Sequence, residues 1–178
     1  LDERWQVPAA YDDGQVLLRA TEEQGREGVI SKRRSSRYEP GSRSRNWLKF
    51  PHRQRRSWVV GGWRPETGSQ SRLGALLVGR PSISGEPSGA SLVFMGRVGS
   101  GITGKSAATL LHLLTPLARD TSPFGEVSKA DTLGTNWVEP RLVIDVESLG
   151  LAGSGRLRQP AFVGIRSDLG PGDVGEQS

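Results

Sequence analysis

Residues 91–117, SLVFMGRVGSGITGKSAATLLHLLTPL, decide the fold, because a strand pattern passes there through a glycine-rich turn into a helix pattern. Residues 91–98 are apolar enough to form a short buried strand. Ser106 is placed to cap the start of the helix. The helix pattern is carried by apolar residues that recur at steps of three and four: Ala107, Leu110, Leu111, Leu114 and Leu117. The stretch therefore predicts one strand followed by one amphipathic helix.

Four more strand patterns surround this stretch, separated by turns rich in Gly, Pro and Ser: residues 57–63, 73–79, 142–149 and 161–166. The 24 Gly and 11 Pro in 178 residues also favour short strands over long helices. Strands in this number, with a helix inserted after the third, fit an oligonucleotide-binding (OB) fold barrel. The pattern alone also permits another small β-barrel. The predicted fold class is mainly β.

The N-terminal stretch has a different pattern, of mixed α and β character. Apolar residues at helical spacing follow Asp13, which is expected to cap a helix, and Gly25 is expected to end it. Residues 28–32 and 47–50 then have the composition of short strands, joined by the turn-rich loop 33–46. Two strands on either side of such a loop predict a hairpin.

These patterns divide the chain into two domains. Residues 1–51 form the first and residues 57–170 the barrel. Between them, residues 52–56 (HRQRR) are basic and lack apolar periodicity, which predicts a hinge. Residues 171–178 are expected to be a flexible tail.

The net charge of +5 is concentrated in one part of the chain. Between Arg26 and Arg56 the only acids are Glu27 and Glu39. Such clustering favours a polyanion, because a protein that binds phosphates gains from the release of counterions. The eleven cationic residues of this stretch are Arg26, Lys32, Arg33, Arg34, Arg37, Arg43, Arg45, Lys49, Arg53, Arg55 and Arg56.

Composition also excludes several classes of protein. The chain has no Cys and two isolated His, which rules out disulfides, thiolate metal sites and a histidine-based zinc site. No apolar run approaches the roughly 20 residues that a membrane-spanning helix needs, and no secretory leader is visible. We therefore expect no membrane partner and a cytoplasmic location.

A competing motif lies inside the decisive stretch. From Gly99 to Ser106 the sequence GSGITGKS satisfies the phosphate-loop pattern G-x-x-x-x-G-K-[ST], and Asp145 could end a metal-binding strand. A phosphate-loop ATPase, however, needs a parallel sheet with repeated crossover helices. Only one convincing helix lies between residue 57 and the C-terminus. The ATPase is the less favoured alternative.

Two motifs of the N-terminal part carry a family resemblance. Residues 27–32 (EGVISK) and 47–49 (WLK) resemble the fourth and fifth nucleotidyltransferase motifs of ATP-dependent DNA ligases, closest to the bacterial end-joining and repair type. The likeness continues in the family's order through five more stretches: VVGGW at 59–63, LGALLVG at 73–79, MGRVGSG at 95–101, WVEP at 137–140 and GRLRQP at 155–160. The resemblance implies the C-terminal part of an adenylation domain followed by the OB domain.

The family implies an enzyme that seals 5′-phosphate/3′-hydroxyl breaks in DNA through an AMP intermediate, in DNA repair. By resemblance, Lys32 and Lys49 contact the AMP phosphate and Glu27 helps to hold Mg²⁺ or Mn²⁺. Arg166 and Asp168 match the sixth motif, which is linked with the outer phosphates of ATP. The implied partners are nicked or broken double-stranded DNA and other end-joining proteins. The arginines expected to bind DNA are Arg33, Arg34, Arg37, Arg43, Arg45, Arg53, Arg55 and Arg56.

Departures from the family pattern limit what residues 1–178 are expected to do alone. Pro51 and Leu169 stand where the family usually keeps lysines in its fifth and sixth motifs. The nucleophilic Lys-x-Asp-Gly motif is absent, the chain begins at Leu1, and its only Met is Met95. We therefore expect a C-terminal fragment that cannot adenylate itself. The remaining alternative is an OB module that binds nucleic acid without catalysis.

Overall fold

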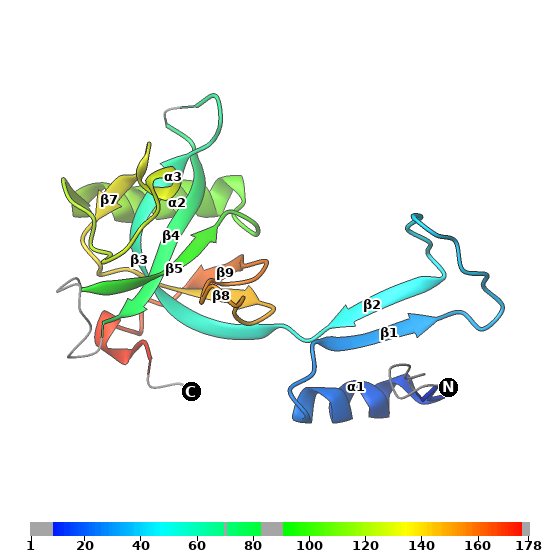
Figure 1. Cartoon of the computed structure of the whole chain (residues 1–178). Helices are drawn as coiled ribbons and strands as arrows, with labels where there is room; N and C mark the ends of the chain where they lie inside the picture. The colour runs from blue at the N-terminus through cyan, green and yellow to red at the C-terminus, as the bar shows by residue number, and fades with distance from the viewer. Residues whose placement is uncertain (1–8, 70, 83–90, 176–178) are drawn as a thin grey trace. The chain divides into compact units, whose positions relative to one another are not determined.

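The computed structural model describes residues 9–69, 71–82 and 91–175, which belong to two compact units (Figure 1). The first unit ends at His52 and the second begins at Arg53.

The first unit consists of one helix and one hairpin. Helix α1 (Gly14–Glu23) begins at Asp13, whose carboxylate accepts hydrogen bonds from the backbone N–H groups of Gln15 and Val16 at 3.0 and 3.1 Å. The helix stops before Gly25, which adopts a left-handed φ of +65°. The predicted cap and stop are both confirmed.

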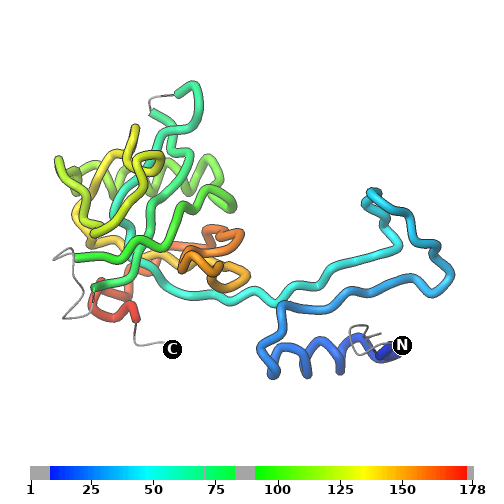
Figure 2. The backbone as a smooth tube through the Cα atoms, viewed as in Figure 1, coloured from blue at the N-terminus to red at the C-terminus, as the bar shows by residue number. Residues whose placement is uncertain are grey.

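Strands β1 (Gly28–Lys32) and β2 (Trp47–Pro51) pair antiparallel, and the loop 33–46 joins their ends (Figure 2). The predicted strands are confirmed, with β2 one residue longer than expected. Gly28 has a φ of +135°, and a Cβ atom there would lie 2.2 Å from the carbonyl oxygen of Phe50. The hairpin therefore requires glycine at its start.

The second unit is mainly β and resembles an OB fold. The described strands are β3 (Gln54–Pro65), β4 (Leu73–Pro81), β5 (Leu92–Val98), β6 (Ala118–Arg119), β7 (Asn136–Val138), β8 (Val143–Ser148) and β9 (Ala161–Ile165). Their order is β5-β4-β3-β7-β6, and β8 pairs with both β3 and β9. All the pairings between these strands are antiparallel. The parallel sheet of a phosphate-loop ATPase is therefore contradicted.

The sheet is open, but its two ends approach one another. Ser100, just after β5, forms an isolated parallel bridge with Ala161 of β9, and the N–H of Phe162 donates to the carbonyl oxygen of Ser100 at 2.8 Å. Gly101 has a φ of +82°, and a Cβ atom on it would lie 2.3 Å from the carbonyl oxygen of Phe162. This close approach gives the glycine-rich turn a structural reason.

Helix α2 (Gly104–Leu114) follows that turn, as predicted, but its cap is different. Thr103 is the N-cap, and its side chain accepts a hydrogen bond from the N–H of Ser106. Ser106 returns a hydrogen bond by accepting the N–H of Thr103 at 2.8 Å. The predicted cap at Ser106 is therefore wrong, because Ser106 is the reciprocal partner in a capping box.

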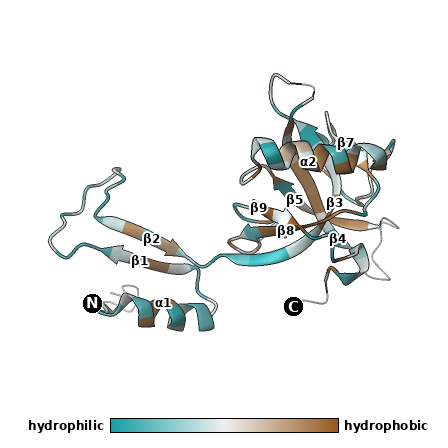
Figure 3. Cartoon of the chain, turned by 180° about the vertical axis from the view of Figure 1, so that it is seen from behind, coloured by the Kyte–Doolittle hydropathy of each residue, from teal (hydrophilic) through white to brown (hydrophobic). Residues whose placement is uncertain are grey.

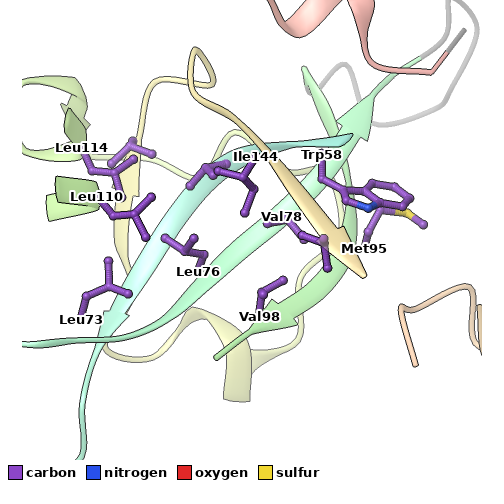
Figure 4. Close-up of a cluster of buried hydrophobic side chains, with 12 residues drawn as sticks. Trp58, Leu73, Leu76, Val78, Met95, Val98, Leu110, Leu114 and Ile144 are labelled. Atoms are coloured by element: carbon purple, nitrogen blue, oxygen red, sulfur yellow. The ribbon is translucent and has the colours of Figure 1, made fainter. Parts of the chain in front are cut away.

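Buried side chains form one cluster on each face of the sheet. Trp58 and Val60 belong to the larger cluster together with Leu110 and Leu114 of α2 (Figure 4), while Val59 points into the smaller one. This alternation follows from the period of two along a strand. The second unit therefore has buried apolar side chains on both faces of its sheet.

Some predicted boundaries differ from the structure. Residues 54–56, expected in an irregular hinge, are the hydrophilic start of β3 (Figure 3) and pair with β8. Residues 171–175, expected in the flexible tail, contain a 3₁₀ helix (Pro171–Asp173) and the buried Val174. Residues 176–178 lie outside the described part.

Sequence patterns also missed the shortest elements: β6, β7, the helix α3 (Lys129–Thr132) and a 3₁₀ helix (Thr115–Leu117). Within the described ranges, no helix has the length and apolar content to cross a membrane.

Candidate nucleotide and nucleic-acid site

Lys32 and Lys49 project from the same face of the β1–β2 hairpin. Lys32 pairs with Trp47 and Lys49 pairs with Ile30, so each lysine lies diagonally across from the other. Diagonal neighbours in an antiparallel pair lie about 7–8 Å apart at the backbone, within reach of long side chains. Both lysines are exposed. Two ammonium groups so placed can reach oxygens of one phosphate.

Trp47 organises this face. The ammonium Nζ of Lys32 lies 4.3 Å from the centroid of the Trp47 ring, a cation–π contact. Tyr38 packs on the same indole at a centroid distance of 5.5 Å, and the indole N–H donates to the Ser36 hydroxyl at 3.2 Å. Trp47 thereby ties both Lys32 and the loop 33–46 to the hairpin. Sequence reasoning missed this role, which depends on the cross-strand pairing of Lys32 with Trp47.

A surface hollow of about 490 Å³ lies beside Lys49. Its lining is cationic and aromatic, with a single acid: Arg37, Tyr38, Glu39, Gly41, Ser42, Arg43, Ser44, Trp47 and Lys49. The structure therefore brings together Lys49 and two of the predicted DNA-binding arginines. Glu39 is a lining residue that sequence reasoning did not select.

Glu27 directly precedes β1 and is exposed. Its carbonyl oxygen accepts the N–H of His52 at 3.0 Å, which closes the base of the hairpin. Within residues 9–69, 71–82 and 91–175, no group of three or more His, Cys, Asp or Glu side chains is gathered as a metal site. The single carboxylate of Glu27 still fits Mg²⁺, which is often held by one or two carboxylates together with substrate phosphates.

The predicted DNA-binding arginines are all exposed. Arg34 forms an ion pair with Asp12 in the first unit. In the second unit, Arg53 donates to the carbonyl oxygen of Gln159 at 3.3 Å, and Arg55 forms an ion pair with Asp145 at 2.7 Å. Arg33, Arg45 and Arg56 complete the set, with Arg37 and Arg43 in the hollow.

The predicted pair of the sixth motif is present in the second unit. Arg166 donates from Nε and Nη2 to the two carboxylate oxygens of Asp168, at 2.9 and 2.7 Å. These hydrogen bonds lower the pKa of Asp168 to about 2 and raise the pKa of Arg166. The guanidinium of Arg166 also lies 3.4 Å from Asp145.

Asp145, which could end the metal-binding strand of an ATPase by its sequence, is a buried carboxylate. It is 3% exposed and accepts hydrogen bonds from Ser57 at 2.6 Å and from Arg55 at 2.8 Å. Burial raises the pKa of its carboxyl, but the Ser57 and Arg55 hydrogen bonds outweigh burial and hold the pKa below its ordinary value. The charged form is therefore the stable one.

Family models of known proteins match each of the two units. The family model "ATP dependent DNA ligase C terminal region" matches residues 69–169, and the model "ATP dependent DNA ligase domain" matches residues 3–50. The multifunctional non-homologous end joining DNA repair protein LigD of Mycobacterium tuberculosis is 41% identical over 164 residues, which is 91% of this chain and 21% of that protein. LigD of Pseudomonas aeruginosa is 35% identical, over 88% of this chain and 18% of its own length.

Solved structures give the same result. The crystal structure of the ligase domain from M. tuberculosis LigD has a TM-score of 0.65 at 40% identity, covering 93% of this chain and 52% of that one. A mycobacterial DNA ligase D complexed with ATP and MES has a TM-score of 0.60 at 39% identity, covering 91% and 50%. This chain thus spans a minor part of its curated relatives. With the family model covering most of the second unit and the fold in agreement, the chain belongs to the ATP-dependent DNA ligase family.

Proposed function

We propose that residues 1–178 supply part of the nucleotide site and the OB domain of an ATP-dependent DNA ligase of the bacterial end-joining and repair type. The observation that carries this proposal is the placement of Lys32 and Lys49 on one hairpin face, beside a hollow lined by Arg37 and Arg43, in a chain of the ligase family. In this proposal residues 1–51 complete an adenylation domain, the hinge lies at residues 52–53 before β3, and residues 54–175 form the OB domain.

The proposed reaction has three phosphoryl-type transfers. A lysine amine from outside residues 1–178 attacks the α-phosphorus of ATP, forms a P–N bond, loses a proton and releases pyrophosphate. The 5′-phosphate of a DNA break then displaces the lysine and takes the AMP. Finally the 3′-hydroxyl attacks that 5′-phosphate, loses its proton, and AMP leaves as the strand is sealed.

The residues of this chain act mainly through charge and position. Phosphoryl transfer is catalysed chiefly by neutralising and orienting the transferred group. Lys32 and Lys49 would neutralise the α-phosphate oxygens, and an ammonium is a compact donor suited to this task. Glu27 would hold Mg²⁺ or Mn²⁺, which supplies further charge neutralisation when bound. Arg166 would face the outer phosphates of ATP, with Asp168 fixing one edge of its guanidinium.

The exposed arginines would bind the backbone of nicked or broken duplex DNA. Arginines of this kind contribute affinity through counterion release and carry no sequence information. Support comes from the relatives, which are named as end-joining proteins, and from a relative solved in complex with ATP. We place the protein at the bacterial nucleoid, together with other end-joining proteins.

The test uses the full-length gene product and a labelled nicked duplex. Lys32→Ala and Lys49→Ala should each lower the rate of nick sealing by about 10²-fold or more, as expected when one charge-stabilising donor is removed. Lys105→Ala and Lys129→Ala are matched controls on the second unit and should seal at nearly the wild-type rate. Full activity of both hairpin variants would overturn the proposal.

Two outcomes point to the alternatives. An OB module without catalysis would shift nicked DNA in a gel but never join it. A phosphate-loop ATPase would lose nucleotide binding in Lys105→Ala. Residues 1–178 alone, incubated with labelled ATP and Mg²⁺, should remain unlabelled, and a covalent AMP adduct on them would contradict the proposed origin of the nucleophile.

A further inference from the structure

Asp145 joins Arg166 to the core of the second unit. Its side chain lies at the meeting point of β3, β8 and β9 and takes part in ion pairs with two arginines. We propose that Asp145 is a positioning residue, which fixes the Arg166 guanidinium so that its free N–H pair faces the outer phosphates of ATP. This inference rests on the proposed function.

The register of the strands explains why a carboxylate is buried here. Asp145 of β8 pairs directly with Ser57 of β3, and Arg55 lies two residues earlier on the same face of β3. The Ser57 hydroxyl donates to Oδ1 at 2.6 Å, and Arg55 contacts Oδ2 from Nε at 2.8 Å and from Nη2 at 2.7 Å. A buried carboxylate is tolerated only when it is paired and hydrogen-bonded in this way.

The hydrogen bonds of Arg166 leave a defined pair of donors. A guanidinium carries five N–H groups in a planar fork. Asp168 takes one N–H from Nε and one from Nη2, along the side edge of the fork. Asp145 and Ser57 share an N–H of Nη1, at 3.4 Å each. Among the contacts of the described residues, one N–H on each terminal nitrogen is left for a ligand.

A guanidinium N–H is a charge-assisted donor that suits a phosphate oxygen. The plane of the guanidinium is set because carboxylates hold it on two sides. Asp168 is exposed, whereas Asp145 is anchored by Ser57 and Arg55 in the sheet. Arg166 is itself only partly exposed, and its backbone N–H donates to the carbonyl oxygen of Val143 at 2.9 Å. Of the two carboxylates that contact the Arg166 guanidinium, Asp145 is therefore the more rigidly held.

If Asp145 positions Arg166, its substitution should affect adenylation by ATP much more than the sealing of a pre-adenylated nick. Outer phosphates are present when ATP adenylates the enzyme and absent when a pre-adenylated nick is sealed. In the full-length gene product, Asp145→Asn should lower the rate of lysyl-adenylate formation and raise the KM for ATP, together by about 10- to 100-fold in kcat/KM. Sealing of a pre-adenylated nick should change by less than about 3-fold, because Asn keeps the shape of the side chain.

Asp131→Asn is the matched control, since it removes another aspartate that is paired with an arginine, Arg97, at 3.1 Å in the same unit. It should leave both reactions close to wild type. Asp145→Glu keeps the charge and should recover part of the lost adenylation. Ser57→Ala should give a smaller loss in the same direction, and it tests the proposal if Asp145→Asn fails to fold.

A double-mutant cycle separates positioning from structure. If Asp145 acts through Arg166, Asp145→Asn should add little to the adenylation defect of Arg166→Ala. Equal losses in both reactions, or full additivity in the cycle, would make Asp145 a purely structural residue and overturn the inference. Normal adenylation by Arg166→Ala would instead refute the proposed role of Arg166 itself, so the two failures are distinguishable.

Discussion

The two units of this chain differ in how they hold their functional side chains. In residues 9–52 no side chain is buried, and Ile30 and Leu48 on the hairpin are 52% and 51% exposed. The second unit buries residues on both faces of its sheet. The lysines of the proposed nucleotide site thus lie on a unit with little internal support, whereas Arg166 lies on a unit with a core.

This difference has a physical consequence for the site. Catalytic geometry is precise only when the supporting residues are locked by packing. In the first unit, the lysines are held locally by the hairpin register and by the contacts of Trp47. The positions of the two lysines therefore depend on these local contacts rather than on a packed core.

The largest contrast should come from truncating one leucine in each unit. Leu110 is fully buried between α2 and the sheet, so Leu110→Ala should lower the free energy of unfolding by about 2–5 kcal/mol. Leu48→Ala, on the exposed hairpin, should change it by less than about 0.5 kcal/mol. Urea unfolding of residues 1–178 measures both. Comparable losses would mean that the first unit has a core after all.

A glycine substitution should have the next largest effect. A Cβ atom on Gly61 would lie 2.5 Å from the ring of Phe124, so Gly61→Ala should destabilise the second unit by about 1–3 kcal/mol through overpacking. Phe124→Leu in the same chain should recover part of this loss. Gly153→Ala is the control, because nothing lies within 4 Å of its added Cβ. A neutral Gly61→Ala would show that the ring can move aside.

The long elements of both units could be predicted from the sequence, and the reasons are local. The apolar periods of α2 and of the main strands, and the cap at Asp13, depend on neighbours in the chain. Strands of two or three residues such as β6 and β7 are too short to show a period. The α2 cap was misplaced because both Thr103 and Ser106 can cap, and only the backbone geometry distinguishes them.

In the candidate site, too, features that depend on neighbours in the chain could be predicted, and features that depend on tertiary contacts could not. Lys32 and Lys49 could be selected from motifs, but the contact of Lys32 with Trp47 depends on pairing across the hairpin. Asp145 could not be recognised as a partner of Arg166, because they are brought together by β8 and β9 and lie 21 residues apart in sequence. Tertiary contacts of this kind leave no local pattern.

Removing one helix cap in each unit should have a smaller effect. Thr103→Ala removes the N-cap of α2, which packs on the core, and should cost about 1 kcal/mol of the stability of the second unit. Asp13→Ala should reduce the helical signal of α1 without moving the urea midpoint of the second unit, because α1 buries no residue. Far-UV circular dichroism without denaturant reports the helical signal, and the midpoint of the main urea transition reports the second unit. A common shift would show that the units unfold together.

Acid should produce the smallest of these changes through the Arg166–Asp168 pair of the second unit. The pKa of Asp168 is about 2 in the folded state, below its ordinary value of 3.8, because of the hydrogen bond from Arg166. The unfolded state therefore binds more protons as the pH falls from about 4 to 2, so the free energy of unfolding decreases across this window.

Asp168→Asn should flatten that part of the pH profile of unfolding. The effect should shrink in about 1 M salt, because the Arg166–Asp168 pair is exposed on the carboxylate side and is screened. Asp145 lies in the same network but is buried, and its lowered pKa should leave a salt-resistant part of the acid slope. If the whole slope disappeared in salt, the carboxylate of Asp145 would not be anchored in the sheet as its contacts with Ser57 and Arg55 indicate.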